Sequence, residues 1–271
     1  MPQQAVRTGT TLYYEEHGEG EPLLLVMGTS GSIPLWGPLV PRLAERHRVI
    51  AFDNRGLGGS ARGEGPISVA SLAEDAAALL EALDVPRAHV LGWSLGSAIA
   101  QELALAHPQR VASAVLYATW GRGDGFQRSI LAAFRLPYAV RDMEAALAVS
   151  GMAFSPELLD RPDVEELFAP LVPAFPQTEE QMAVTVEQWD ADLAFDSLDR
   201  LGGITAPTLV VVGEQDLLTP PRLSRAVADA IPGARYELVT GPGSSHGLHL
   251  ERPDDLLKIV TGFLEEHRGS A

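Results

Sequence analysis

The amino-acid sequence predicts an α/β fold in which a mostly parallel sheet is covered on both faces by helices. Short, continuously apolar runs of strand length recur along the chain, and amphipathic stretches of helix length lie between them. A hydrophobic content of 46% over 271 residues is sufficient for one large domain. We find no internal repeat or low-complexity tract that would indicate another architecture.

The first part of the chain alternates predicted strands with predicted helices. Alternating apolar and polar residues predict an edge hairpin from Ala5–Arg7 and Leu12–Glu16. Continuous apolar runs predict buried strands at Pro22–Met27, Arg48–Phe52, Val85–Gly92 and Val111–Tyr117. Apolar spacings of three and four predict helices over Leu35–His47, over 72–83 with Ser68 or Ser71 as its cap, and over Leu95–Ala106.

The rhythm changes between about Trp120 and Gly203, where prolines break helix-like segments and no buried strand is predicted. Those segments are Gln127–Phe134, Asp142–Val149 and Thr178–Trp189. Beyond them, strands at Pro207–Val212 and Arg235–Val239 alternate with helices at Pro221–Ala230 and Pro253–His267, which brings the sheet to eight strands. We therefore expect a core of residues 1–119 and 204–271 and a helical cap of residues 120–203 inserted in the same domain.

Composition excludes several classes of function. The chain carries 20 Lys and Arg against 36 Asp and Glu, and this formal charge of −16 disfavours nucleic acid as a partner. Cysteine is absent, so a nucleophile must be oxygen or nitrogen, and a single lysine, Lys258, argues against Schiff-base chemistry. The N-terminal segment does not resemble a signal peptide and no long apolar run occurs. We expect a cytoplasmic protein that binds a small molecule and no membrane; self-association is left open.

Ser94 is the candidate nucleophile. It lies in Gly92-Trp93-Ser94-Leu95-Gly96, directly after a predicted strand and directly before a predicted helix. A nucleophile elbow needs this context, because flanking glycines let the backbone pack closely around a strained turn. The new helix directs its free amides at a developing oxyanion, and the amide of Leu95 is the natural first donor. Ser245, in Gly243-Ser244-Ser245-His246-Gly247, matches the same pattern but lacks the strand and the helix.

His246 is the candidate general base. It stands in a loop of glycine, proline and serine after the last predicted strand, whereas most other histidines fall at helix ends or in the first hairpin. His249 lies in the same loop, closer to the last helix. The two histidines and Glu251 form a weak zinc pattern, and we expect neither a metal nor a cofactor.

Asp216 is the candidate acid that orients the base. It directly follows the most hydrophobic predicted strand, and a carboxyl group there can bond the far nitrogen of an imidazole. Asp124, after the strand ending at Tyr117, is the main alternative, and Glu214 is a weaker one.

With these residues, nearly the full chain resembles the α/β-hydrolase superfamily. The order Ser94, Asp216, His246 matches the order of the triad in that family, and Glu251 and Pro253 follow His246 at the family's spacing. A further segment resembles the family's pattern after its fourth strand, through Asp53, Arg55, Gly56, Gly58 and Ser60, which we interpret as scaffold residues.

The segments MGTSGSIPLW and DNRGLGGS are most similar to the enol-lactone hydrolase and small-esterase branch. Where many relatives have His-Gly before the oxyanion residue, this chain has Met27-Gly28. The resemblance implies the amide of Thr29 as second oxyanion donor, with Ser30 as an alternative.

The predicted activity is hydrolysis of a carboxylic ester or lactone through an acyl-enzyme on Ser94. The same triad is compatible with hydrolysis of C–C bonds, with perhydrolase or haloperoxidase chemistry and with a natural-product biosynthetic step. A ligand receptor without turnover is the alternative from another class. We expect a small to medium, largely apolar substrate, because aromatic and Met side chains are available as pocket walls. These are Trp36, Trp93, Phe126, Phe134, Met152, Phe154, Met182 and Trp189.

Overall fold

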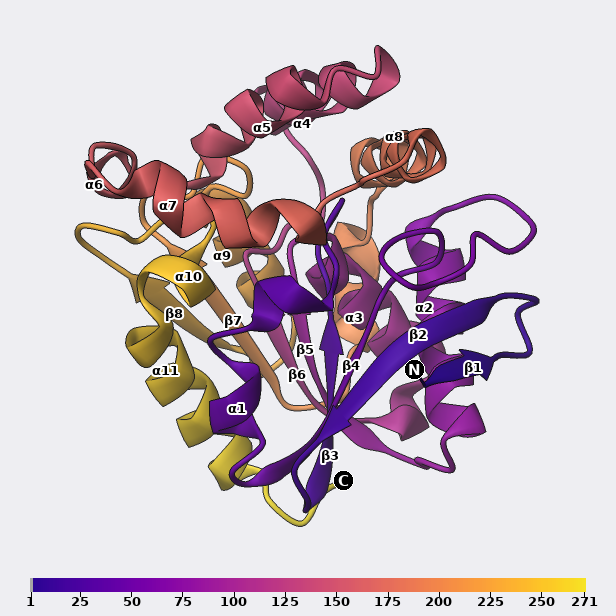
Figure 1. Cartoon of the computed structure of the whole chain (residues 1–271). Coiled ribbons are helices and arrows are strands. Elements are labelled where there is room, and N and C mark those ends of the chain that lie inside the picture. The colour runs from indigo at the N-terminus through magenta and orange to yellow at the C-terminus, as the bar shows by residue number, and fades with distance from the viewer. Residues whose placement is uncertain (1) are drawn as a thin grey trace.

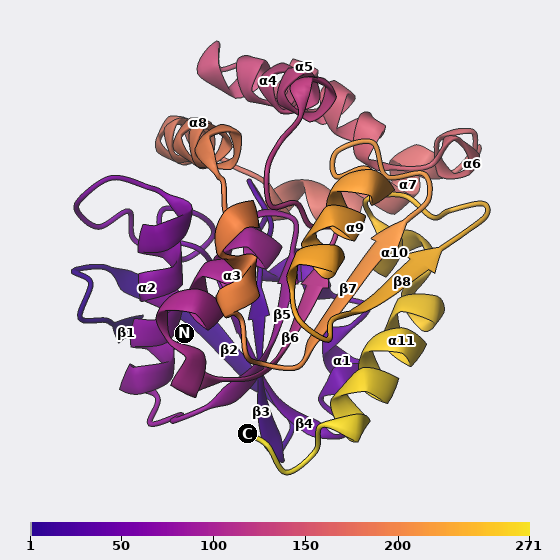
Figure 2. The same cartoon turned by 180° about the vertical axis from the view of Figure 1, so that it is seen from behind.

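The computed structural model describes residues 2–271, and these residues form an eight-stranded sheet with helices on both faces (Figures 1 and 2). The sheet order is β1-β2-β4-β3-β5-β6-β7-β8, and every pair from β4 to β8 is parallel. The strands are β1 (Gln3–Ala5), β2 (Thr11–His17), β3 (Glu21–Val26), β4 (His47–Phe52), β5 (Ala88–Trp93), β6 (Val111–Tyr117), β7 (Thr208–Gly213) and β8 (Arg235–Val239). The predicted α/β architecture is confirmed.

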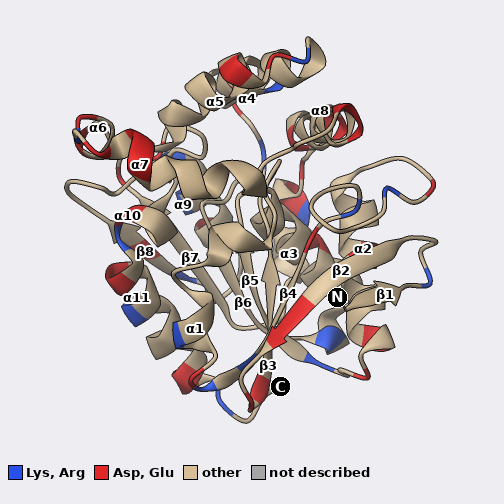
Figure 3. Ribbon diagram, viewed as in Figure 1, with Lys and Arg blue, Asp and Glu red and all other residues tan. Residues whose placement is uncertain are grey.

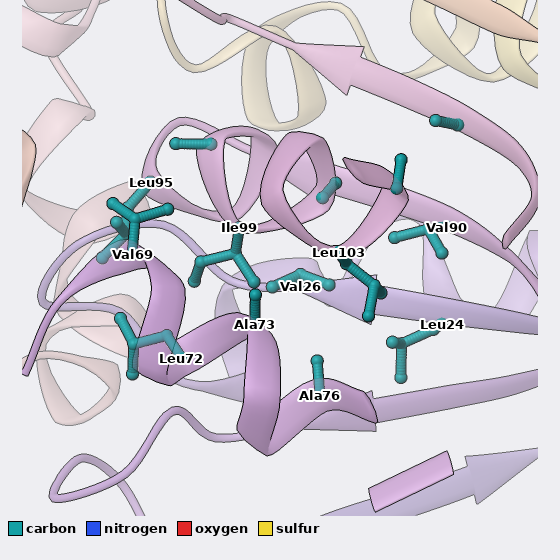
Figure 4. Close-up of a cluster of buried hydrophobic side chains, with 14 of the residues drawn as sticks. Leu24, Val26, Val69, Leu72, Ala73, Ala76, Val90, Leu95, Ile99 and Leu103 are labelled. Carbon is teal, nitrogen blue, oxygen red and sulfur yellow. The ribbon is translucent and has the colours of Figure 1, made fainter. Parts of the chain in front are cut away.

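Both sheet faces are covered by helices of the core. Helices α2 (Val69–Ala82), α3 (Leu95–Ala106) and α9 (Pro221–Ala230) pack on one face, and α1 (Val40–Leu43) and α11 (Pro253–Glu266) on the other. Figure 4 shows apolar side chains of α2 and α3, such as Ala73 and Ile99, close to Val26 of β3. This continuous burial is why the central strands contain almost no polar residues.

The prediction of one helix over Leu35–His47 is wrong. The structure has a one-turn 3-10 helix at Ile33–Trp36 and then the single turn of α1. Gly37, Pro38 and Pro41 interrupt the segment, because proline lacks the amide that an uninterrupted helix needs. The apolar spacing remains useful, since Leu35, Leu39 and Leu43 are still buried.

The segment 120–203 is built from helices that lie over the edge at which the parallel strands end (Figure 1). They are α4 (Gly125–Ala139), α5 (Met143–Ser150), α6 (Pro156–Leu159), α7 (Val164–Phe168) and α8 (Glu179–Ala194). A bridge between Arg122 and Asp196 joins the two ends of this segment. We use the name cap for residues 120–203. No helix among residues 2–271 has the length and apolar character to cross a membrane.

The segment after β4 ties two loops together beneath the cap. Asp53 accepts hydrogen bonds from the amides of Ile33 (2.8 Å) and Gly59 (2.8 Å), and burial raises the pKa of its carboxyl group to about 6. Arg55 forms a buried, bidentate pair with Asp75 of α2, at 2.5 Å for each contact. These residues bond to protein groups, which agrees with our interpretation of them as scaffold.

Candidate active site

Ser94 occupies a strained turn between β5 and α3. Its backbone has φ 55° and ψ −122°, a conformation that costs energy for any residue with a Cβ atom. The flanking glycines make the turn possible: a Cβ on Gly96 would lie 1.9 Å from the carbonyl oxygen of Val26, and one on Gly92 2.1 Å from that of Gly96. The strand, strained turn and helix that the elbow requires are therefore present, and Ser94 lines a cavity.

Asp216 and His246 meet at the ends of β7 and β8. Asp216 Oδ2 lies 2.9 Å from His246 Nδ1, and both side chains are buried. The amides of Leu218 (2.9 Å) and Thr219 (2.8 Å) donate to Oδ1, and the Thr219 hydroxyl donates to Oδ2 at 2.7 Å. These three donors fix the carboxyl group, which in turn orients the imidazole ring.

The His246 loop is anchored so that its ring borders the same cavity as Ser94. The carbonyl of His246 accepts hydrogen bonds from the Tyr117 hydroxyl (2.7 Å) and from Trp93 Nε1 (3.0 Å). Ser94 and His246 both line a cavity of about 50 Å³, which we call the Ser94 chamber. Within residues 2–271 the Ser94 hydroxyl has no hydrogen bond to His246; such contacts often tighten only when substrate is bound.

Two backbone amides beside Ser94 have no protein acceptor among the described residues. One belongs to Leu95, the first residue of α3, and the other to Thr29, which lines the Ser94 chamber. The amide of Ser30, the alternative donor, is occupied because it donates to Gln188 Oε1 at 2.9 Å. The amides of Thr29 and Leu95 thus stay the predicted donors to an oxyanion.

The loop that carries Thr29 is held by residues from β4's end and from the cap. Asn54 donates to the carbonyl of Met27 at 3.0 Å. The Thr29 hydroxyl donates to Asp192 Oδ2 at 2.6 Å, and Gln188 holds the next amide, so one face of α8 supports the loop. These contacts fix the loop in a chain that has Met27-Gly28 where many relatives have His-Gly.

Asp192 is completely buried at this junction. Burial raises the pKa of its carboxyl group to about 8, although the hydrogen bond from Thr29 acts in the opposite direction. The carboxyl group is therefore mostly protonated at neutral pH, and it accepts from Thr29 without placing a charge beside the loop.

A family model described as "alpha/beta hydrolase fold" matches residues 21–253. The chain belongs to the α/β-hydrolase fold family. This agrees with the resemblance stated from the sequence.

Known relatives cover nearly the whole hydrolase. It is 36% identical over 258 residues to the Azorhizobium caulinodans protein named "Putative carbamate hydrolase RutD", covering 94% of this chain and 95% of that protein. The solved enol-lactonase from Burkholderia xenovorans LB400 is 29% identical with a TM-score of 0.86, covering 97% and 100%. The "Putative non-heme bromoperoxidase BpoC" from Mycobacterium tuberculosis H37Rv is 31% identical with a TM-score of 0.84, covering 95% and 97%. The chain is a hydrolytic enzyme of this family.

The remaining polar candidates of the hydrolase lie away from the Asp216–His246 contact. Asp124 caps α4 and pairs with Arg222, and the hydrogen bond from the Gln127 amide is the main cause that lowers the pKa of its carboxyl group. Glu214 accepts from the amide of Gly241 at 3.0 Å. Neither of these two carboxyl groups contacts His246 in the described residues.

His249 and Ser245 contact protein groups that hold the His246 loop in place. Burial lowers the pKa of the His249 imidazole to about 3, and the ring packs 4.3 Å from the Trp93 ring, measured between centroids. The Ser245 hydroxyl bonds to Glu251, which also accepts the amide and hydroxyl of Ser155 in the cap. Glu251 thereby links the His246 loop to the cap.

Four of the six aromatic residues predicted as pocket walls line the Ser94 chamber, namely Trp93, Phe134, Phe154 and Trp189. The predictions for Trp36 and Phe126 are corrected. Trp36 is fully buried among core side chains below the chamber, because its 3-10 helix packs against the sheet. Phe126 is 48% exposed at the start of α4, with the guanidinium of Arg222 over its ring.

Sequence reasoning missed several residues at this site. Tyr138, Phe175 and Leu218 line the chamber, and Gln188 and Asp192 hold the Thr29 loop. The spacing of Gln188 and Asp192, one helical turn apart on either side of Trp189, is the one local signal that could have pointed to a buried polar face.

We predict that Ser94→Gly is more stable toward unfolding than Ser94→Ala, by about 1 kcal/mol. Both variants lack the hydroxyl, but only alanine keeps a Cβ atom at φ 55°. Urea denaturation measures the difference. At Ser129, which is exposed within α4, the same pair of substitutions should give the reverse order. Equal stabilities of the two Ser94 variants would contradict a strained turn.

We predict that the stability of Asp192→Asn relative to the native protein increases with pH. Between the unfolded-state pKa near 3.8 and the folded-state pKa of about 8, only the folded native protein keeps the Asp192 proton. Native stability therefore falls as pH rises, by at most about 1.4 kcal/mol per unit from this group, while asparagine does not titrate. Urea denaturation at pH 5 and pH 7 measures the change. Gln188→Leu, which alters the adjacent contact without a titrating group, serves as control; a pH-independent difference for Asp192→Asn would refute the prediction.

Proposed function

We propose that the protein is a serine hydrolase of carboxylic esters and lactones with small to medium, largely apolar groups, and that Ser94, His246 and Asp216 form its catalytic triad. The observation that carries the proposal is the 2.9 Å contact between Asp216 and His246, whose ring shares a chamber with Ser94 on its strained turn. The available amides of Thr29 and Leu95 beside Ser94 add to this support.

In the proposed reaction, His246 Nε2 takes the proton of the Ser94 hydroxyl as Oγ bonds to the substrate carbonyl carbon. The amides of Thr29 and Leu95 donate to the resulting oxyanion, and Asp216 stabilises the imidazolium. The bond from the carbonyl carbon to the leaving oxygen then breaks, and His246 protonates that oxygen. Water, deprotonated by His246, attacks the acyl-enzyme; the carboxylic acid departs and Ser94 regains its proton.

The chamber walls and the relatives support this substrate class. Apart from Ser94, His246, Thr29, Ser30 and Ser150, the chamber is lined by glycine, aromatic and aliphatic residues. The relative from Burkholderia xenovorans is described as an enol-lactonase, and a lactone carbonyl presents the electrophile and leaving oxygen that the reaction needs. We also propose that residues 120–203 act as the specificity cap, because α4 and α8 supply Phe134, Tyr138 and Trp189 to the chamber.

Perhydrolysis is a second candidate function, favoured by the likeness to the protein named as a non-heme bromoperoxidase. Hydrogen peroxide would replace water as the nucleophile that attacks the acyl-enzyme, and a peracid would leave in place of the carboxylic acid. The acylation step and its residues are the same in both functions.

The test is turnover of p-nitrophenyl acetate and δ-valerolactone by the native protein and by Ser94→Ala. We expect the substitution to lower kcat at least about a thousandfold, because the nucleophile of the acylation step is lost. Ser129→Ala, an exposed serine of α4, should match the native protein. A fluorophosphonate should label Ser94 alone, as mapped by peptide mass spectrometry. Full activity of Ser94→Ala, or labelling of a different residue, would refute the proposed nucleophile.

A further inference from the structure

A second and much larger cavity adjoins the Ser94 chamber. It has a volume of about 510 Å³ and lies between α5, α7 and the 3-10 helix of residues 169–174. The two cavities share four wall residues, which are Trp93, Ser150, Phe154 and Phe175. We call the larger cavity the apolar lobe. Because these four residues belong to both walls, the lobe lies directly beside the chamber.

The chemistry of the lobe wall is almost entirely hydrocarbon. Leu147, Val164, Phe168, Leu171 and Leu250 are among its aliphatic and aromatic residues. Glu165 of α7 is the one charged residue in the described lining, and Figure 3 shows the acidic colour on that helix. A wall of this kind favours an uncharged chain, and an acidic residue on it opposes a terminal carboxylate.

The two cavities differ in volume, and only the larger one can hold most of a medium-sized substrate. The Ser94 chamber, at about 50 Å³, is far below the roughly 300–1,000 Å³ of ordinary ligand pockets, whereas the lobe lies within that range. The chamber has room for little beyond a carbonyl and its nearest atoms, so the bulk of a medium-sized substrate needs another space. Phe154 and Phe175 stand at the shared wall, and the Phe154 ring packs on Phe168 with centroids 4.6 Å apart.

We propose that the apolar lobe binds an uncharged alkyl chain of the substrate, so that the hydrolase prefers esters or lactones carrying a chain of medium length over acetates. This inference rests on the proposed function, since it places that chain relative to the carbonyl attacked by Ser94. Phe154 and Phe175 position the chain where it passes from the chamber into the lobe.

The first experiment compares kcat/KM for p-nitrophenyl acetate, butyrate, hexanoate and octanoate. Each added methylene that enters the lobe should raise kcat/KM by about fourfold until the lobe is filled. Methyl, butyl and hexyl esters of acetic acid form a second series, which shows whether the chain enters from the acyl or the alcohol side. A rise in either series supports the proposal, and flat profiles in both series overturn it.

The second experiment fills the lobe by substitution. Val164→Trp places an indole at the lobe wall and should lower the ratio of kcat/KM for octanoate over acetate at least about tenfold. Val140→Trp is the matched control, because Val140 is 64% exposed at the end of α4 and lines neither cavity. Leu159→Glu adds a charge at a 40% exposed position of the lobe and should act in the same direction if Val164→Trp does not fold. An unchanged ratio in the folded variants overturns the proposal.

A binding measurement separates this inference from the proposed function. Ser94→Ala, which cannot form an acyl-enzyme, should be stabilised against thermal unfolding by methyl octanoate more than by methyl acetate. Adding Val164→Trp should remove that difference. If methyl octanoate stabilises the protein but turnover does not depend on Ser94, the proposed function is refuted and the binding role of the lobe is supported. If turnover depends on Ser94 but shows no preference for chain length, the proposed function is supported and the binding role of the lobe is refuted. Self-association abolished by Val164→Trp, with flat chain profiles, would identify the lobe as an interface between copies and overturn the inference.

Discussion

The close approach of α3 to the end of β3 is the constraint on which the site depends. Gly96 lies so near the carbonyl of Val26 that a single added carbon would overlap it. The helix can therefore begin directly above the strand ends, and the chain enters it through a turn that forces Ser94 to a positive φ. The same approach brings the start of the helix next to the loop of Thr29, since a Cβ on Gly28 would lie 3.2 Å from the Cβ of Ser94. The position of the serine and the position of both available amides thus follow from one packing contact.

The cap supplies walls to the Ser94 chamber and also holds the loops on which the chamber is built. Helix α8 reaches down to the Thr29 loop through Gln188 and Asp192, and Glu251 binds Ser155 at the opposite side of the cap. These contacts join residues that are more than 90 positions apart in the sequence. A cap attached at both places fixes the walls of the chamber relative to Ser94. A substitution of Gln188 or Asp192, neither of which lines the chamber, therefore acts on the Thr29 loop without touching a substrate.

The sequence predicted those parts of the site that follow from local geometry. Ser94, Asp216 and His246 each stand directly after a predicted strand or in the loop that follows one, and parallel strands bring such positions to one edge. Gln188 and Asp192 escaped prediction because their partners lie across the whole molecule and α8 has the composition of an ordinary surface helix. The expectation for Trp36 failed because its short 3-10 helix buries the ring in the core, and the residue type alone does not distinguish a core position from a pocket wall.

The formal charge of −16 raises the question of how a site for an oxyanion persists in so acidic a chain. No carboxyl group lines the Ser94 chamber in the part of the chain that the structure describes. Asp192 lies beside the Thr29 loop, and an ionised carboxylate bonded to the Thr29 hydroxyl would oppose negative charge at the Thr29 amide. Burial raises the pKa of its carboxyl group to about 8, so that most of the group is protonated near pH 7. Burial of Asp192 therefore has two consequences. The side chain is placed where it can hold the Thr29 loop, and the raised pKa removes most of the negative charge that would oppose an anion there.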